Sequence, residues 1–195
     1  MTETSLRPLR ADARRNRDRL IAVALRAFTD PGPEVSLEAI ARGAGVGIGT
    51  LYRHFPTREA LIEAAYRSEL ERLCAAAPDL LAEQAPDVAL RQWMDRLVDY
   101  MTAKRGMADA LRAVIASGAN PFAQSLASMT AAVQSLLDAA AAAGSIRADV
   151  PPVDVLKGVS GVSLVAGEPD QREQAGRLLD LLMDGLRYRS AAPRA

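Results

Sequence analysis

Apolar residues recur every three to four positions through the first third of the chain, which predicts amphipathic α-helices. Two of these helices are preceded by residues that can cap a helix N-terminus: Ser36 for one, and Thr57 for the helix that follows Pro56. The predicted inward faces are Leu20, Ile21, Ala24, Leu25 and Phe28 in a helix that begins at Asp12 and ends before Pro31; Leu37, Ile40, Ala41 and Ala44 in the next; Leu51 and Phe55 in a helix over residues 47–55; and Ala60, Leu61, Ala64 and Ala65 in the fourth.

The rest of the chain is rich in alanine and continues as amphipathic helices separated by proline and glycine. A break over residues 76–86 is predicted to end the fourth helix. Asn120 and Pro121 are typical of a helix start, and Gly144 of a helix end. The last two helices are predicted over about 152–166 and, after a turn at 167–169, about 170–189. No strand pattern is present, so the predicted class is all-α with about nine helices.

The segment over residues 36–61 carries the most informative pattern. Its two short helices are joined at Gly43 and Gly45, and glycine supplies the permissive backbone that a tight turn between steeply crossed helices needs. The second helix turns Thr50, Arg53 and His54 toward solvent. This arrangement is a helix-turn-helix, which places its second helix in the major groove of double-stranded DNA.

At the run GTLYRHF over residues 49–55 and TREAL over residues 57–61, the chain resembles the N-terminal domain of TetR/AcrR-type bacterial transcriptional regulators. The resemblance covers about residues 14–73. It implies that the recognition helix contacts phosphates and base edges, and that the cation opening the next helix, Arg58, contacts the DNA backbone. Two positions depart from the family pattern. Gly47 stands where serine is common, and Ile48 stands where a polar or basic side chain that contacts bases is often found. The predicted DNA-binding residues are Ser36, Gly47, Ile48, Gly49, Thr50, Tyr52, Arg53, His54 and Arg58.

Charge is distributed unevenly along a chain whose formal net charge is zero. Residues 1–58 hold ten arginines against six acids, and the remainder holds fourteen cations against eighteen acids. A positive N-terminal part agrees with a small DNA-binding head. Arginines at 14, 15, 17 and 19 are predicted to add affinity for the DNA backbone rather than sequence choice, and a solvated basic face is the alternative.

One helix-turn-helix covers half of an operator, so the C-terminal part is predicted to form a homodimer on a palindromic site. The helix over residues 152–166 contains glycines, which have no side chain and commonly permit close helix packing. Packing of the glycines inside one chain is the alternative. The predicted dimer-interface residues are Gly158, Gly161, Val162, Val165, Leu178, Leu182 and Leu186.

The family resemblance also implies a small-molecule pocket in the C-terminal part. Large, adaptable side chains with few charges favour a neutral or weakly polar effector, although an ordinary core explains the same pattern. The predicted pocket residues are Trp93, Met94, Leu97, Tyr100, Met101, Met107, Leu111, Phe122, Leu126 and Met129.

Enzymatic function is disfavoured by the residue inventory. The single histidine, His54, lies in the recognition helix, and the single cysteine, Cys74, is expected to pack rather than react. No metal-ligand spacing, nucleophilic triad or phosphate-binding loop is present in the sequence, so no catalytic residue, metal or cofactor is predicted. An all-helical adaptor without DNA binding is the other alternative.

These patterns together predict a cytoplasmic DNA-binding regulator, a repressor that a small molecule releases from its operator, with no membrane partner. Three parts are expected along the chain: a flexible basic arm over residues 1–11, a helix-turn-helix domain over 12–73 that includes the start of a long fourth helix, and a ligand-binding and dimerisation domain over 74–195.

Overall fold

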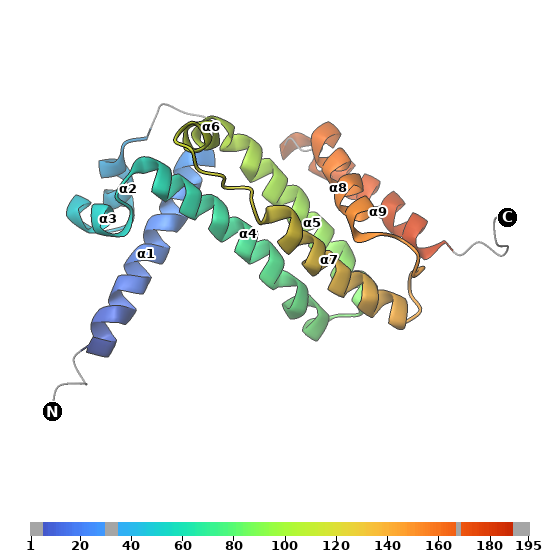
Figure 1. The fold of residues 1–195 in the computed structure, drawn as a ribbon. Coiled ribbons are helices and arrows are strands. Elements are labelled where there is room, and N and C mark those ends of the chain that lie inside the picture. The colour runs from blue at the N-terminus through green and yellow to red at the C-terminus, as the bar shows by residue number, and fades with distance from the viewer. Residues whose placement is uncertain (1–5, 30–34, 167–168, 189–195) are drawn as a thin grey trace. The chain divides into compact units, whose positions relative to one another are not determined.

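The computed structural model describes residues 6–29, 35–166 and 169–188, and every regular element in these ranges is helical (Figure 1). The predicted all-α class is therefore confirmed. None of the helices in these ranges has the length and apolar character needed to cross a membrane. The elements are α1 (Leu6–Thr29), α2 (Leu37–Gly43), α3 (Ile48–His54), α4 (Arg58–Glu83), α5 (Pro86–Gly106), α6 (Ala108–Ala116), α7 (Ser125–Ala142), α8 (Pro152–Ala166), the 3₁₀ turn η1 (Pro169–Gln171) and α9 (Arg172–Arg187).

The chain forms two compact units. The first comprises the chain up to Ser68 together with Lys104–Pro121, and the second comprises Glu69–Ala103 together with the chain from Phe122 onward. Helices α4 and α5 each contribute residues to both units. The sequence suggested one division near residue 73, but α6 belongs with the N-terminal unit. The assignment of separate functions to the parts of the chain stays a prediction.

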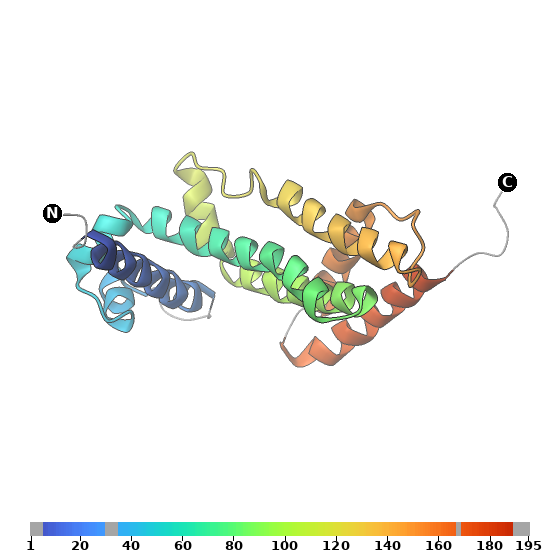
Figure 2. The same cartoon turned by 90° about the horizontal axis from the view of Figure 1, so that it is seen from below.

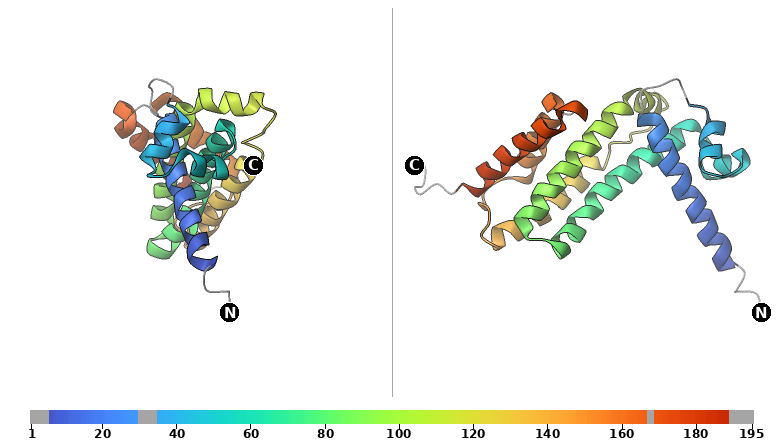
Figure 3. Two further views of the ribbon diagram at one scale, coloured as in Figure 1. Left: turned by 90° about the vertical axis from the view of Figure 1, so that its left-hand side faces the viewer. Right: turned by 180° about the vertical axis from the view of Figure 1, so that it is seen from behind.

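In the first unit, α1, α2 and α3 pack against one another (Figure 3). The side chains of Leu20, Ile40, Leu51 and Leu61 are fully buried there. Because these residues were predicted from helical spacing, the periodicity located the core of this unit correctly.

The first helix begins at Leu6, six residues before the predicted start. Residues 6–11 of the predicted flexible arm are therefore helical, and residues 1–5 lie outside the described residues. Pro8 does not prevent this start, because a proline in the first turn of a helix removes no intrahelical hydrogen bond. The sequence predicted the later start because residues 1–11 have no apolar period and contain Pro8.

Helix α4 also differs from the prediction, since it extends well into the break expected over residues 76–86 and ends at Glu83 with Pro78 inside it. Proline at this position cannot donate to the carbonyl one turn earlier, which costs the helix a hydrogen bond. Ala76, Ala77 and Leu80, on either side of the proline, are buried, and their burial offsets the lost hydrogen bond. Pro78 itself is exposed. Packing has overridden local propensity here.

The seventh helix begins at Ser125 rather than at Asn120–Pro121. The N–H of Ser125 donates to the carbonyl of Phe122 at 3.0 Å and closes a turn over this segment, so the helix starts later. Its predicted end is confirmed, because Gly144 has a φ of 71°. The predicted turn at 167–169 lies largely outside the described residues, as does the predicted end of the last helix at Arg189.

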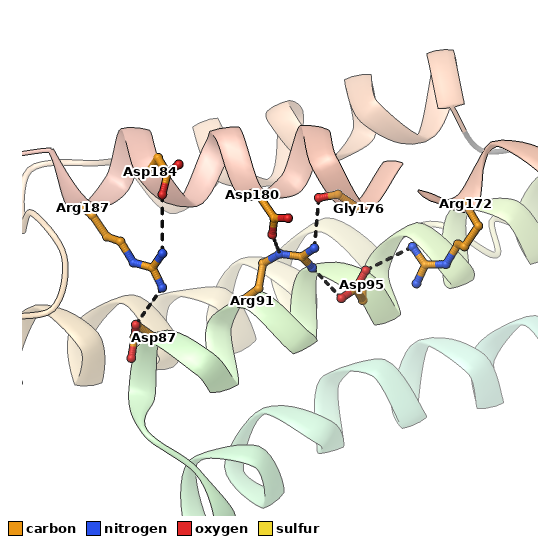
Figure 4. A network of polar contacts seen from close by, with 8 residues as sticks. All are labelled: Asp87, Arg91, Asp95, Arg172, Gly176, Asp180, Asp184 and Arg187. Carbon is orange, nitrogen blue, oxygen red and sulfur yellow. Dashed lines mark hydrogen bonds and ion pairs between the residues drawn. The ribbon is translucent and has the colours of Figure 1, made fainter. Parts of the chain in front are cut away.

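In the second unit, α7, α8 and α9 pack side by side, and α4 lies alongside α5 (Figures 1 and 2). Its core contains Trp93, Leu136, Val159 and Leu179, all fully buried. Ion pairs attach α9 to α5 at three levels (Figure 4). The pairs are Arg91 with Asp180 at 2.8 Å, Arg172 with Asp95 at 3.1 Å and Arg187 with Asp87 at 2.9 Å.

Candidate functional site

The turn between α2 and α3 has the geometry of a helix-turn-helix. Ser36 Oγ accepts a hydrogen bond from the Ala39 N–H at 3.2 Å and caps the start of α2, as predicted. Gly45 has a φ of 68°, and the N–H of Val46 donates to the carbonyl of Ala41 at 3.0 Å. Gly43 plays a different part, because a Cβ there would lie 3.0 Å from Val23 Cγ1 of α1. One glycine shapes the turn and the other permits close packing.

Gly45→Ala is expected to destabilise the protein by about 1 kcal/mol, because the left-handed backbone is costly for a residue with a Cβ. The nearest atom to a Cβ at this position is Arg19 Nη1 at 3.9 Å, so the cost is one of backbone conformation rather than of clash. Urea unfolding followed by circular dichroism measures it. Gly49→Ala in α3 is the control, since a Cβ there meets nothing within 4 Å and alanine favours a helix. Equal stability of the two variants would contradict this role for Gly45.

Helix α3 has one buried and one exposed face. Leu51 and Phe55 are buried and anchor it, whereas Tyr52 is 47% exposed and Arg53 is exposed. Gly47 occupies the N-cap position without a side-chain hydrogen bond. Among the other predicted DNA-binding residues, Ser36 and Gly49 are exposed, and Ile48, Thr50, His54 and Arg58 are half-buried.

Arg58 takes part in the packing of the first unit. Its Nη1 donates to the carbonyl of Val35 at 2.7 Å, and its guanidinium carbon lies 5.0 Å from the centroid of the Phe28 ring. Arg17 is placed similarly, 5.6 Å from the centre of the Phe55 ring. The neighbouring Thr57 caps α4 as predicted, since its Oγ1 accepts from the Ala60 N–H at 3.1 Å. Arg58 therefore ties the start of α4 to α1 and to the segment before α2, a role that the sequence did not indicate.

The predicted dimer-interface residues fall into two groups. A Cβ on Gly158 would lie 3.4 Å from Leu182 Cδ2 of α9, so this glycine faces its own chain, and Val162 and Leu186 are buried in that chain. Leu178 and Leu182 are half-buried. The remaining two residues, Gly161 and Val165, are exposed, as are Leu164 of α8 and Leu181 and Gly185 of α9. We call these exposed positions on the two packed helices the α8–α9 apolar face; it comprises Gly161, Leu164, Val165, Leu181 and Gly185.

Most of the predicted pocket residues lie in the core. Trp93, Met94 and Leu97 are fully buried, and the Trp93 indole N–H donates to the carbonyl of Leu73 at 2.9 Å. The burial of these three residues agrees with the alternative interpretation, in which they belong to an ordinary hydrophobic core. Met107, Leu111 and Met129 are buried, Met101 and Phe122 are half-buried, and Leu126 is 60% exposed.

A cavity of about 590 Å³ lies between α4 and α5 in the second unit. Tyr100 is the one predicted pocket residue that lines it. The other lining residues do not belong to the apolar stripes from which the pocket was predicted, although the charged residues of α4 and of α5 each recur at helical spacing. The lining residues are Glu69, Arg72, Leu73, Ala75, Ala76, Asp79, Arg96, Asp99 and Tyr100.

Several charges at the cavity are already paired. Arg72 binds Glu69 one turn away on α4 at 2.6 Å, and Asp99 lies 3.3 Å from Arg172 of α9. Desolvation raises the pKa of the Asp99 carboxyl, an effect that the Arg172 guanidinium opposes and Asp95 reinforces. Burial likewise raises the pKa of the nearby Cys74 thiol, which makes the reactive thiolate scarcer at neutral pH.

No cluster of three or more metal-ligating side chains occurs among the described residues. The geometry thus consists of a helix-turn-helix with a polar exposed face, an outward apolar face on α8 and α9, and a charged cavity.

Comparison with known proteins identifies both parts of the chain. Residues 20–65 match the model of bacterial regulatory proteins of the tetR family, and residues 85–188 match the C-terminal domain of SbtR-like transcriptional regulators. An HTH-type transcriptional regulator of Staphylococcus aureus is 38% identical over 64 residues, which are 32% of this chain. The match spans about a third, 35%, of that curated relative's length.

Solved structures match over nearly the whole chain. A TetR transcriptional regulator from Streptomyces coelicolor is 56% identical with a TM-score of 0.84, covering 89% of this chain and 99% of that one. A TetR regulatory protein from Mycobacterium vanbaalenii is 36% identical with a TM-score of 0.76, covering 93% and 100%. These relatives are transcriptional regulators, not enzymes, and the chain belongs to the TetR family of bacterial transcriptional regulators.

Proposed function

We propose that this regulator is a repressor that binds a palindromic operator as a homodimer and leaves it when a small molecule binds the second unit. The observation that carries the DNA-binding part is the construction of α3, in which buried Leu51 and Phe55 fix a helix whose Tyr52 and Arg53 point outward. A regulator that acts on the bacterial chromosome works in the cytoplasm, which is the location we propose.

The proposed DNA contacts divide into two classes. Thr50 and Arg53 read base edges in the major groove, where Arg can bind guanine with two N–H groups. Tyr52 and the exposed arginines of α1, Arg14 and Arg15, contact phosphates and supply affinity without sequence choice. Ser36, Gly47, Ile48, Gly49, His54 and Arg58 complete the proposed interface.

The proposed dimer uses the α8–α9 apolar face. Leu164, Leu181 and Val165 are 76%, 67% and 64% exposed, and large exposed side chains that share one surface are typical of a protein interface. A second copy of the chain fits this surface because a two-fold axis brings identical patches together. It also supplies the second reading head that a palindrome requires. Gly161 and Gly185 leave open space for close approach.

An operator selected from random DNA by the purified protein is expected to be palindromic and to bind two chains, with half-sites separated by about one helical turn or a multiple of it. Sequencing of the selected fragments gives the site, and sedimentation of the complex gives the stoichiometry. A stable complex of one chain on one half-site would contradict the dimeric part. Failure to select any sequence would favour the adaptor alternative.

A further inference from the structure

The cavity between α4 and α5 contains two charges of opposite sign that the protein leaves unpaired. Arg72 pairs with Glu69, and Asp99 pairs with Arg172. Across the described ranges, Arg96 of α5 and Asp79 of α4 have neither a hydrogen-bond partner nor an ion-pair partner. Both line the cavity, and both side chains are also exposed to solvent.

The rest of the lining includes Leu73, Ala75, Ala76 and Tyr100, of which Leu73, Ala76 and Tyr100 are each only 4% exposed. A cavity of about 590 Å³ falls within the range of small-molecule sites. A ligand that pairs with both Arg96 and Asp79 therefore needs one anionic group and one cationic group.

We infer that this cavity binds a zwitterionic small molecule, with an anionic group at Arg96 and an ammonium group at Asp79. Arginine favours a carboxylate or phosphate because its planar N–H groups can bind two oxygens at once. This ligand class differs from the neutral or weakly polar effector that the apolar stripes predict. The inference deepens the proposed effector control and rests on that proposal for its regulatory meaning, whereas binding is measured without DNA.

The protein contains its own reporter of the cavity. Trp93 is the single tryptophan, its side chain is fully buried, and its indole N–H donates to the carbonyl of Leu73. Since Leu73 lines the cavity, occupancy is expected to alter the fluorescence of Trp93.

The test titrates the full-length protein with ω-amino acids of four to eight carbons at constant ionic strength. The varied length allows for different separations of the two charges. Hexanoate, hexylammonium and 1-hexanol are the single-charge and neutral comparisons. We expect saturable binding of at least one ω-amino acid, seen by Trp93 fluorescence and by calorimetry, at a lower concentration than for any of the three comparison compounds.

Arg96→Gln and Asp79→Asn are each expected to weaken that binding by about fivefold, the effect of one exposed ion pair. Arg26→Gln, at an exposed position of α1, is the matched control and should leave it unchanged. Circular dichroism verifies that the variants fold. Equal binding of 1-hexanol, no saturable binding by either method, or unchanged binding in both cavity variants would overturn the inference.

The two proposals fail separately. A bound ω-amino acid that leaves operator affinity unchanged supports the zwitterion site and contradicts effector release. Titrations that show no binding by a protein that still selects a palindromic operator overturn the site and leave the DNA-binding proposal intact.

Discussion

If the proposed dimer forms through the α8–α9 apolar face, Leu181→Glu is expected to shift the protein from dimer to monomer at micromolar concentration. Leu181 is 67% exposed in the single chain and lies on the α8–α9 apolar face. Burial of a leucine contributes about 1.5–3 kcal/mol, and two-fold symmetry counts the loss twice. The dimer dissociation constant should therefore rise by about two to four orders of magnitude, before the added cost of burying a carboxylate.

Affinity for the operator should fall when the dimer is lost, because two separate chains no longer hold their helix-turn-helix units at the fixed spacing of the two half-sites. Sedimentation velocity measures the shift to monomer, and gel retardation on the selected operator measures the loss of specific binding. Weak binding to unrelated DNA is expected to persist, since it depends on the charge of each head. A variant that remains dimeric with undiminished operator affinity would show that the interface lies elsewhere.

Two glycines of α8 provide a matched comparison for the same interface. Gly161→Leu should also give a monomer with normal stability, because a Cβ there meets nothing within 4 Å in the single chain. Gly158→Leu should instead cost about 1–3 kcal/mol of chain stability, because its side chain must displace Leu182. Chemical unfolding and sedimentation of both variants separate a defect of folding from a defect of association.

The helix-turn-helix could be predicted from sequence because the signals that mark it are local, although contacts with α1 also hold it in place. Ser36, Gly45 and Thr57 each act on backbone within a few residues, and Leu51 with Phe55 marks the buried face of a single helix. Signals at this range locate the turn and the buried residues of α3 correctly, whereas of the three residues predicted to face solvent Arg53 is exposed and Thr50 and His54 are half-buried.

Features that depend on distant residues could not be predicted in this way. Pro78 disfavours a helix by propensity, yet α4 continues past it, and Ala76, Ala77 and Leu80 around it are buried. The position of α9 likewise determines which side of α8 is covered. Gly158 faces Leu182 of α9, whereas a Cβ on Gly161 would meet nothing within 4 Å. Periodicity found the apolar positions of the C-terminal part, but it could not divide them into core, cavity wall and exposed face.

Arg53→Ala and Arg58→Ala are expected to have different effects, although both remove an arginine from the proposed DNA interface. Arg53 is exposed and, within the described ranges, has no protein partner. Its loss should leave stability unchanged and should remove about 1–3 kcal/mol of base discrimination at particular operator positions. Repeating the operator selection with the variant reveals those positions, and an unchanged sequence preference would reassign Arg53 to phosphate contact.

Arg58→Ala should instead destabilise the protein by about 2–3 kcal/mol. The reason is loss of the charged hydrogen bond to the Val35 carbonyl and of the contact with the Phe28 ring. Affinity should fall by a similar factor for all DNA duplexes. If Arg58 also contacts phosphate, the slope of the logarithm of the binding constant against the logarithm of salt concentration should become less steep by about one. Arg58→Lys keeps the charge but not the planar group, so it should retain the salt dependence and lose part of the stability. Unfolding at the same midpoint as the parent protein in both Arg58 variants would show that its contacts with α1 and Val35 contribute little.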